Sequence, residues 1–212
     1  MSEHSSARGR GFSLRLRALL AAGVVLGLGV TATLASWNDS EFATGSFVTS
    51  SFNTESNVQS AGYADNAASP GPTVTFSGAG LSPSTSAYFT VLVRTKATSI
   101  AGTISLAGAT VGGADAATLG AALVYRVVAT TGTCAAAAFT GSPVFVVGAA
   151  ATYRPLTAAQ EIGVSTALAA ATVSLPGAAT GFCFEVTLPS GASNTLQGKT
   201  ATATWQFTAT SV

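Results

Sequence analysis

The chain has 212 residues, a formal net charge of +1 and only 8% charged residues, against about 25% in an average soluble domain. This balance excludes the basic stripe of a nucleic-acid-binding protein. Hydrophobic residues make up 48% of the chain, which excludes a disordered polymer of low hydrophobicity and high charge.

Residues 1–35 have the organisation of an export signal. Four arginines form its basic start: Arg8, Arg10, Arg15 and Arg17. The apolar residues 18–35 follow and end in Ala-Thr-Leu-Ala, with small residues three and one positions before the expected cut. We therefore expect a signal helix here and cleavage between Ala35 and Ser36. Retention as a membrane anchor is the alternative, because this stretch just reaches spanning length.

Residues 54–212 are expected to form one β-sandwich domain. A long polar loop is expected over residues 53–72, followed by strands of alternating pattern at 73–77, 88–94, 99–106, 123–130, 171–175 and 182–188. The C-terminal strand is the clearest, with Trp205 and Phe207 on one face and Thr204 and Thr208 on the other. Short strands separated by turn signals predict an antiparallel sandwich.

Less regular features complete the domain. Short helices are expected at residues 114–122 and 157–162, and residues 143–170, which lack a clear period, are expected to form an insertion at one end of the sandwich. Arg94 and Lys96 are expected to guard a sheet edge against unwanted pairing. Glu185 falls on the polar face of its strand, so we expect it to be exposed.

Two cysteines lie in the mature region, Cys134 and Cys183. In an exported chain an even number of cysteines indicates a disulfide. Two free buried thiols are the alternative interpretation.

Catalytic motifs are not found in the mature region. Cleavage removes His4, the single histidine, so a Ser–His–Asp triad has no imidazole, and an H-E-x-x-H zinc motif is absent. Asp39 and Glu41 are closely spaced carboxylates, but a solvated acidic patch is their simpler interpretation. We expect no catalytic residue, no metal site and no cofactor.

The residues around the expected cut carry a resemblance to a known family. Trp37-Asn38-Asp39, followed by Phe-Ala-Thr-Gly-Ser-Phe at residues 42–47, resembles the start of the TasA/camelysin family, exported Gram-positive bacterial proteins that a SipW-type signal peptidase processes. The resemblance covers residues 19–53, and residues 81–106 and 197–209 also look like family strands.

The resemblance implies a jelly-roll-like β-sandwich that is secreted or held at the cell surface. It also implies that residues 36–53 can act as a donor strand in a neighbouring subunit. Four aromatic side chains would then fill the pockets of the acceptor: Trp37, Phe42, Phe47 and Phe52. The alternative is that Phe47 and Phe52 are ordinary core residues of their own domain.

A structural role follows from these expectations. We expect a secreted protein of the cell surface or biofilm matrix that polymerises into fibres, alone or with a related matrix protein, and meets the membrane only through its leader. A monomeric adhesion module, presenting its loops to a glycan or a protein, is the alternative. A hydrolase is the third and least favoured hypothesis.

Overall fold

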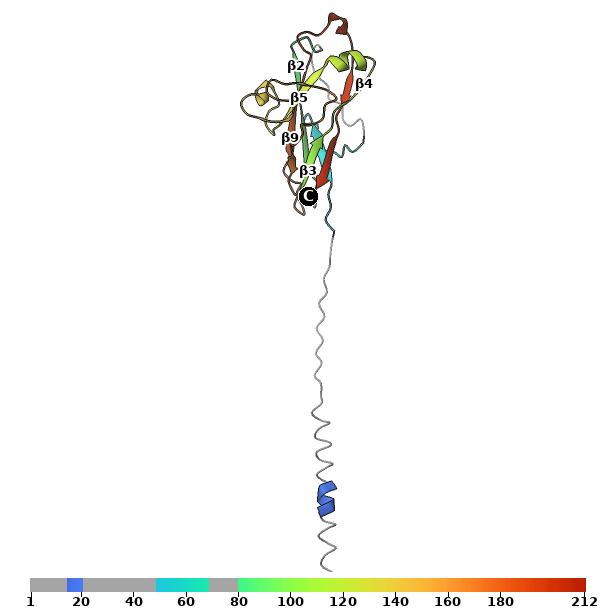
Figure 1. The fold of residues 1–212 in the computed structure, drawn as a ribbon, viewed down its shortest axis with the longest axis vertical. Coiled ribbons are helices and arrows are strands. Elements are labelled where there is room, and N and C mark those ends of the chain that lie inside the picture. Colours follow the sequence, from blue (N-terminus) through green and yellow to red (C-terminus); the bar gives the residue numbers. More distant parts are fainter. Residues whose placement is uncertain (1–14, 21–48, 69–79) are drawn as a thin grey trace, which may run out of the picture. The chain divides into compact units, whose positions relative to one another are not determined.

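The computed structural model describes residues 15–20, 49–68 and 80–212 (Figure 1). The chain divides into two units, Met1–Phe47 and Val48–Val212. In the first unit, residues 15–20 are helical. Among the described residues, no helix is long and apolar enough to cross a membrane. The expected cut between Ala35 and Ser36, the strand at 73–77, and Trp37, Phe42 and Phe47 lie outside the described ranges.

The second unit is an all-β antiparallel sandwich, as predicted. Its larger sheet has the order β1-β2-β9-β5-β6, with β7 also pairing with β5. These strands are β1 Thr54–Val58, β2 Ser86–Thr95, β5 Val124–Ala129, β6 Val144–Val147, β7 Arg154–Pro155 and β9 Thr180–Thr187. Every neighbouring pair in it is antiparallel.

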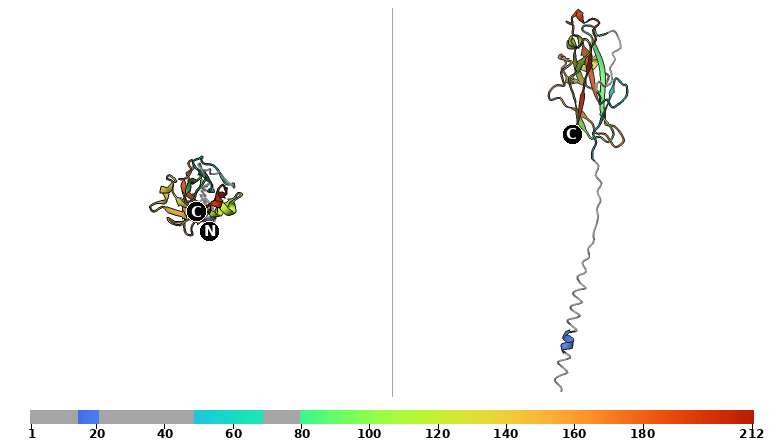
Figure 2. Two further views of the ribbon diagram at one scale, coloured as in Figure 1. Left: turned by 90° about the horizontal axis from the view of Figure 1, so that it is seen from above. Right: turned by 90° about the vertical axis from the view of Figure 1, so that its right-hand side faces the viewer.

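The opposite layer consists of two short sheets, of order β11-β3-β8 and β10-β4. Their strands are β3 Gly102–Leu106, β4 Thr110–Gly112, β8 Thr166–Leu168, β10 Thr202–Thr204 and β11 Phe207–Ser211. Strands of both layers run roughly lengthwise through the unit (Figure 2). Three single-turn helices lie between strands: η1 Ala116–Gly120, η2 Ala136–Phe139 and η3 Asn194–Leu196.

Aromatic side chains from both layers form the main core. Phe184 on β9 stacks on Phe89 of β2 with 4.4 Å between ring centroids, and Trp205 meets Phe184 edge-on at 5.2 Å. Such pairs contribute about 0.5–1.5 kcal/mol each beyond the area they bury. The alternation predicted for β2 is confirmed, because every second residue from Phe89 to Thr95 is buried. β9 is a strand as predicted, but it is buried on both faces instead of one. The C-terminal strand is divided, because β10 pairs with β4 while β11 pairs with β3.

Several local predictions are wrong, and neighbouring segments explain why. The expected loop 53–72 contains β1, whose sequence is polar and which pairs with β2. Residues 157–162 are not helical, because Gln160 uses its side chain to bond the Leu106 amide and the Val164 carbonyl. Residues 171–175 form no strand. The expected insertion 143–170 instead supplies β6, β7 and β8 to the two layers.

Two loops on either side of β6 cover the outer face of the larger sheet. We call residues 131–143 and 148–153 together the cover. Cys134, in its first loop, is joined to Cys183 on β9, which confirms the predicted disulfide. Phe139 of η2 packs with Val128 and Cys183 in a second apolar cluster, separate from the main core.

Candidate functional site

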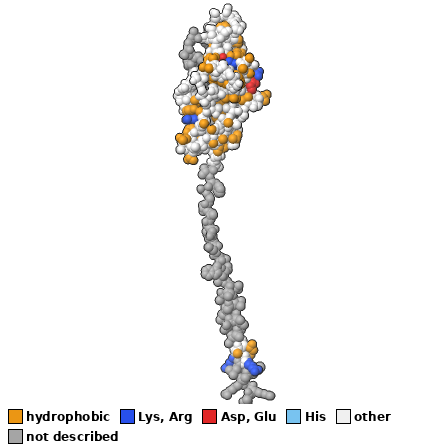
Figure 3. Space-filling model, turned by 90° about the vertical axis from the view of Figure 1, so that its left-hand side faces the viewer, with side chains coloured by type: hydrophobic (Ala, Val, Ile, Leu, Met, Phe, Trp, Pro, Cys, Tyr) orange, Lys and Arg blue, Asp and Glu red, His pale blue; other side chains and the backbone are white. Residues whose placement is uncertain are grey.

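Every charged side chain of residues 49–212 belongs to an ion pair. The region holds five acidic and five basic residues, and they combine in five pairs with N–O distances of 2.5–2.8 Å. The pairs are Glu55–Arg94, Asp65–Lys96, Asp115–Lys199, Glu161–Arg154 and Glu185–Arg126. On the surface, small groups of charge lie within wide uncharged areas (Figure 3). The described part of this unit therefore offers no unpaired carboxylate as an acid or base.

Arg94 and Lys96 do not guard an edge, contrary to expectation. Arg94 lies on β2, which is an inner strand between β1 and β9. Its Nε donates to Glu55 at 2.7 Å, and the Tyr63 ring stacks on its guanidinium at 3.6 Å. Lys96 bonds to Asp65. Both cations tie residues 54–66 to the sheet.

Glu185 is buried, with 3% exposure, which overturns the prediction that it is exposed. The polar face of β9 does not meet solvent, because the cover lies over it. The strand register places Tyr88 of β2 and Arg126 of β5 directly opposite Glu185. One row across three strands therefore brings together a carboxylate, a guanidinium and a phenol.

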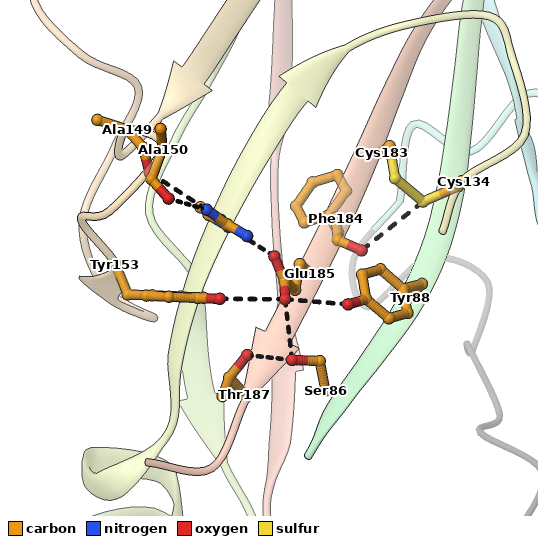
Figure 4. Close-up of polar contacts among 11 residues, drawn as sticks. Ser86, Tyr88, Cys134, Ala149, Ala150, Tyr153, Cys183, Phe184, Glu185 and Thr187 are labelled. Atoms are coloured by element: carbon orange, nitrogen blue, oxygen red, sulfur yellow. Dashed lines mark hydrogen bonds and ion pairs between the residues drawn. A yellow bond between two sulfur atoms is a disulfide. The ribbon is translucent and has the colours of Figure 1, made fainter. Parts of the chain in front are cut away.

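Four donors satisfy the Glu185 carboxylate (Figure 4). Arg126 Nε donates to Oε2 at 2.5 Å, while Ser86 Oγ, Tyr88 OH and Tyr153 OH donate to Oε1 at 2.9, 3.0 and 3.1 Å. Burial raises the pKa of Glu185, but the hydrogen bonds from Arg126, Ser86 and Tyr88 and the Arg126 charge outweigh burial and lower it. Burial, followed by the Glu185 charge, raises the pKa of Tyr88 and of Tyr153, so both phenols stay protonated donors.

Arg126 connects this row to the cover. Its Nη1 donates to the carbonyls of Ala149 and Ala150. Its guanidinium also lies 4.8 Å from the Phe139 ring centroid and 4.6 Å from that of Tyr153, within cation–π range. The arrangement is a closed network in which each charge already has partners. It can hold a loop in place, and Glu185 lines neither of the two surface hollows described below.

No metal centre is formed by the described residues, which contain no group of three or more His, Cys, Asp or Glu side chains suited to an ion. Two open surface hollows are lined by small, hydroxyl and apolar side chains, one around residues 189–196 and one around residues 98–100 and 170–173. Neither hollow is lined by a charged residue.

Phe52 is the one expected donor residue inside the described ranges, and it packs in its own domain. It joins the edge of the main core and lies so close to Gly102 that a Cβ there would sit 2.6 Å from the Phe52 ring. Ser51 also forms a parallel bridge with Ser99. For Phe52, this packing supports the core interpretation over a place in a neighbouring subunit.

Three of the four edges of the two larger sheets are engaged by other groups. Ser56 of β1 exchanges two backbone hydrogen bonds with Ala64. The Val146 carbonyl of β6 accepts from the Glu161 amide. Beside β8, the hydroxyl of Thr180 donates to the Ala167 carbonyl. Each of these contacts occupies backbone groups that another strand would need.

β11 is the fourth edge, and it has no strand neighbour beyond β3 among the described strands. The Ala107 amide bonds to the Gln206 carbonyl and the Val212 amide to the Ala101 carbonyl. Because backbone groups alternate in direction along a strand, those of Phe207, Ala209 and Ser211 point away from β3. The segment also lacks the charge, proline or bulge that usually protects an edge.

Comparison of the chain with protein-family models, with curated proteins and with solved structures found no match. The resemblance of residues 19–53 to the TasA/camelysin family therefore stays a prediction from the sequence.

Proposed function

We propose that this chain is an exported structural protein of a Gram-positive cell surface or biofilm matrix, and that its copies join head to tail by strand addition. The observation that carries the proposal is the outer edge of β11 (Phe207–Ser211), which no other described strand occupies. A strand added there from another copy would gain backbone hydrogen bonds along an open ladder.

The donor in this proposal is the segment that begins at Ser36. Residues 36–47 contain Trp37, Phe42 and Phe47 and no proline, a composition suited to an added strand. The donor precedes the domain and the acceptor is near its C-terminus, so the contact joins unlike surfaces. Such heterologous contacts produce open filaments when they do not close into a ring.

The paired charges support a packing role. Because the charges of residues 49–212 are matched one to one, copies of this domain would approach without strong mutual repulsion. Weakly charged surfaces promote association. The disulfide between Cys134 and Cys183 is compatible with an extracellular location.

Electron microscopy of the chain cut before Ser36 tests the proposal. We expect filaments from this protein, and only monomers after deletion of residues 36–47. Ala209→Pro removes an outward amide of β11 and should also abolish filaments. Thr208→Ala, which alters the neighbouring exposed side chain and no backbone group, is the matched control and should assemble. A monomer at high concentration for the unaltered protein would overturn the proposal.

Export is tested separately by sequencing the N-terminus of secreted material. We expect it to begin at Ser36 when a SipW-type peptidase is present. An intact leader in that material would contradict the proposed cleavage and indicate an anchor instead.

A further inference from the structure

We propose that the cover, residues 131–143 and 148–153, is a releasable strap held by two locks. One lock is the Cys134–Cys183 disulfide, and the other is the Arg126–Glu185 pair. Release of both lets the cover leave the outer face of the larger sheet while the two layers stay folded. This inference is independent of the proposed assembly.

The backbone hydrogen bonds within the cover run inside its own loops. The amides of Ala138 and Thr140 bond to the carbonyls three residues earlier, those of Ala135 and Ala137, and Ala149 and Thr152 bond to each other. Attachment to the strands beneath is made by side chains: Cys134 in the first loop and Tyr153 in the second. Segments that share few backbone bonds with a sheet can open without unfolding it.

The apolar contacts of the first loop are separable from the main core. Phe139 packs with Val128, Cys183, Tyr88 and Phe145. The main core, which contains Phe184, lies on the other side of β9. Lifting the first loop would therefore expose the small outer cluster and leave the inner aromatic core covered.

Arg126 is the shared anchor of both loops. Its guanidinium lies 4.8 Å from the Phe139 ring centroid of the first loop and bonds the Ala149 and Ala150 carbonyls of the second. Glu185 holds this guanidinium on β5. Without that carboxylate, an unpaired cation would remain beneath the cover, which is costly away from water. The loops are the weakest barrier between Arg126 and solvent, so they would move.

Acid should act on the same lock. The groups facing Glu185 are Tyr88 from β2, Arg126 from β5 and Tyr153 from the second loop. A carboxylate whose pKa is lowered in the folded state loses its contribution as pH falls through that pKa. Glu161, whose pKa is lowered by Arg154 and then by the Gly148 amide, acts beside the second loop in the same direction.

Limited chymotrypsin digestion of the full chain at neutral pH tests the two locks. Reduced Glu185→Gln should be cut after Phe139 and Tyr153 at least ten times faster than reduced wild type or oxidised Glu185→Gln. Glutamine carries no charge to pair with Arg126, and it replaces one of the two acceptor oxygens of Glu185 by an NH2 donor. Glu55→Gln breaks an ion pair on the same sheet that does not touch the cover, and it should match wild type. Circular dichroism should show intact sheets throughout.

Equal cleavage rates in the three reduced proteins would overturn the proposal, and so would loss of the sheet signal together with cleavage. Because Glu185→Gln could fail to fold, reduced wild type provides a second measurement. Its cover peptides should lose hydrogen-exchange protection at pH 3 compared with pH 7, while β3 (Gly102–Leu106) stays protected. Loss of protection in both regions together would mean global unfolding and would also overturn the proposal.

Discussion

At the scale of single residues, the buried pair of Arg126 and Glu185 is the least expected feature of this protein. Two charges removed from water are costly, and their mutual attraction only compensates when the remaining donors and acceptors are satisfied. Here the three hydroxyl donors of Ser86, Tyr88 and Tyr153 complete the carboxylate. We therefore expect the pair to fix one arrangement of the side chains around it and to add little to the free energy of unfolding.

This view predicts strong non-additivity. Arg126→Met alone should lower the free energy of unfolding by about 3–5 kcal/mol, because it leaves a buried carboxylate unpaired. Adding Glu185→Leu should recover most of that loss. Urea denaturation measures both variants. Glu55→Gln, at a partly exposed pair, serves as the control and should cost no more than about 1 kcal/mol. Equal, additive losses would contradict the prediction.

Gly102 is a second position where a single added atom, a Cβ, should lower stability. A Cβ added to Gly102 would lie 2.5 Å from the Thr210 carbonyl and 2.6 Å from the Phe52 ring. Gly102→Ala should therefore destabilise the domain by about 1–3 kcal/mol, as measured by thermal unfolding. Gly191→Ala, which would meet no atom within 4 Å, is the control and should unfold near the wild-type temperature.

At the scale of elements, β11 differs from the other sheet edges because its outward backbone groups are unoccupied by described strands. Two proline substitutions test which amides of β11 bond to β3 and which point outward. Thr208→Pro removes an amide directed at β3, whereas Ala209→Pro removes one directed outward. The first should lower the unfolding temperature markedly more than the second. Equal effects would mean that the outward amide of Ala209 is already bonded.

At the scale of the whole molecule, the paired carboxylates should make stability fall at acid pH. Asp65, Asp115, Glu161 and Glu185 all have pKa values lowered in the folded state. Cationic partners are the largest cause for the first three. At Glu185 burial is the largest influence and raises the pKa, but the hydrogen bonds and the Arg126 charge outweigh it. Groups of this kind contribute stability above their unfolded pKa and lose it as pH falls through the folded value. The free energy of unfolding should therefore decline below about pH 4.

Between pH 5 and 8 the curve should be flat for the mature protein, because the single histidine, His4, lies in residues 1–35, which the proposed cleavage removes. Denaturation of the mature protein at several pH values measures both ranges. A step near pH 6.5, where histidine titrates, would contradict this prediction.

Much of the fold follows from local patterns. The alternation in β2 predicts a half-buried strand because the side-chain period of a strand is two, and β2 is buried at every second residue from Phe89 to Thr95. The Cys134–Cys183 pairing follows from there being two cysteines in the region. β1 could not be found this way, because its sequence Thr-Glu-Ser-Asn-Val has no apolar face and is held by pairing with β2.

By itself, the sequence determined the all-β class, the disulfide and the near absence of charge, because composition and period-two alternation act over a few neighbouring residues. Only the tertiary structure decided that Glu185 is buried and that no described strand occupies the outer edge of β11. A polar residue on a strand is exposed unless another segment covers it. The covering loops lie about 30 to 55 positions away in the chain, so no local pattern around Glu185 records them.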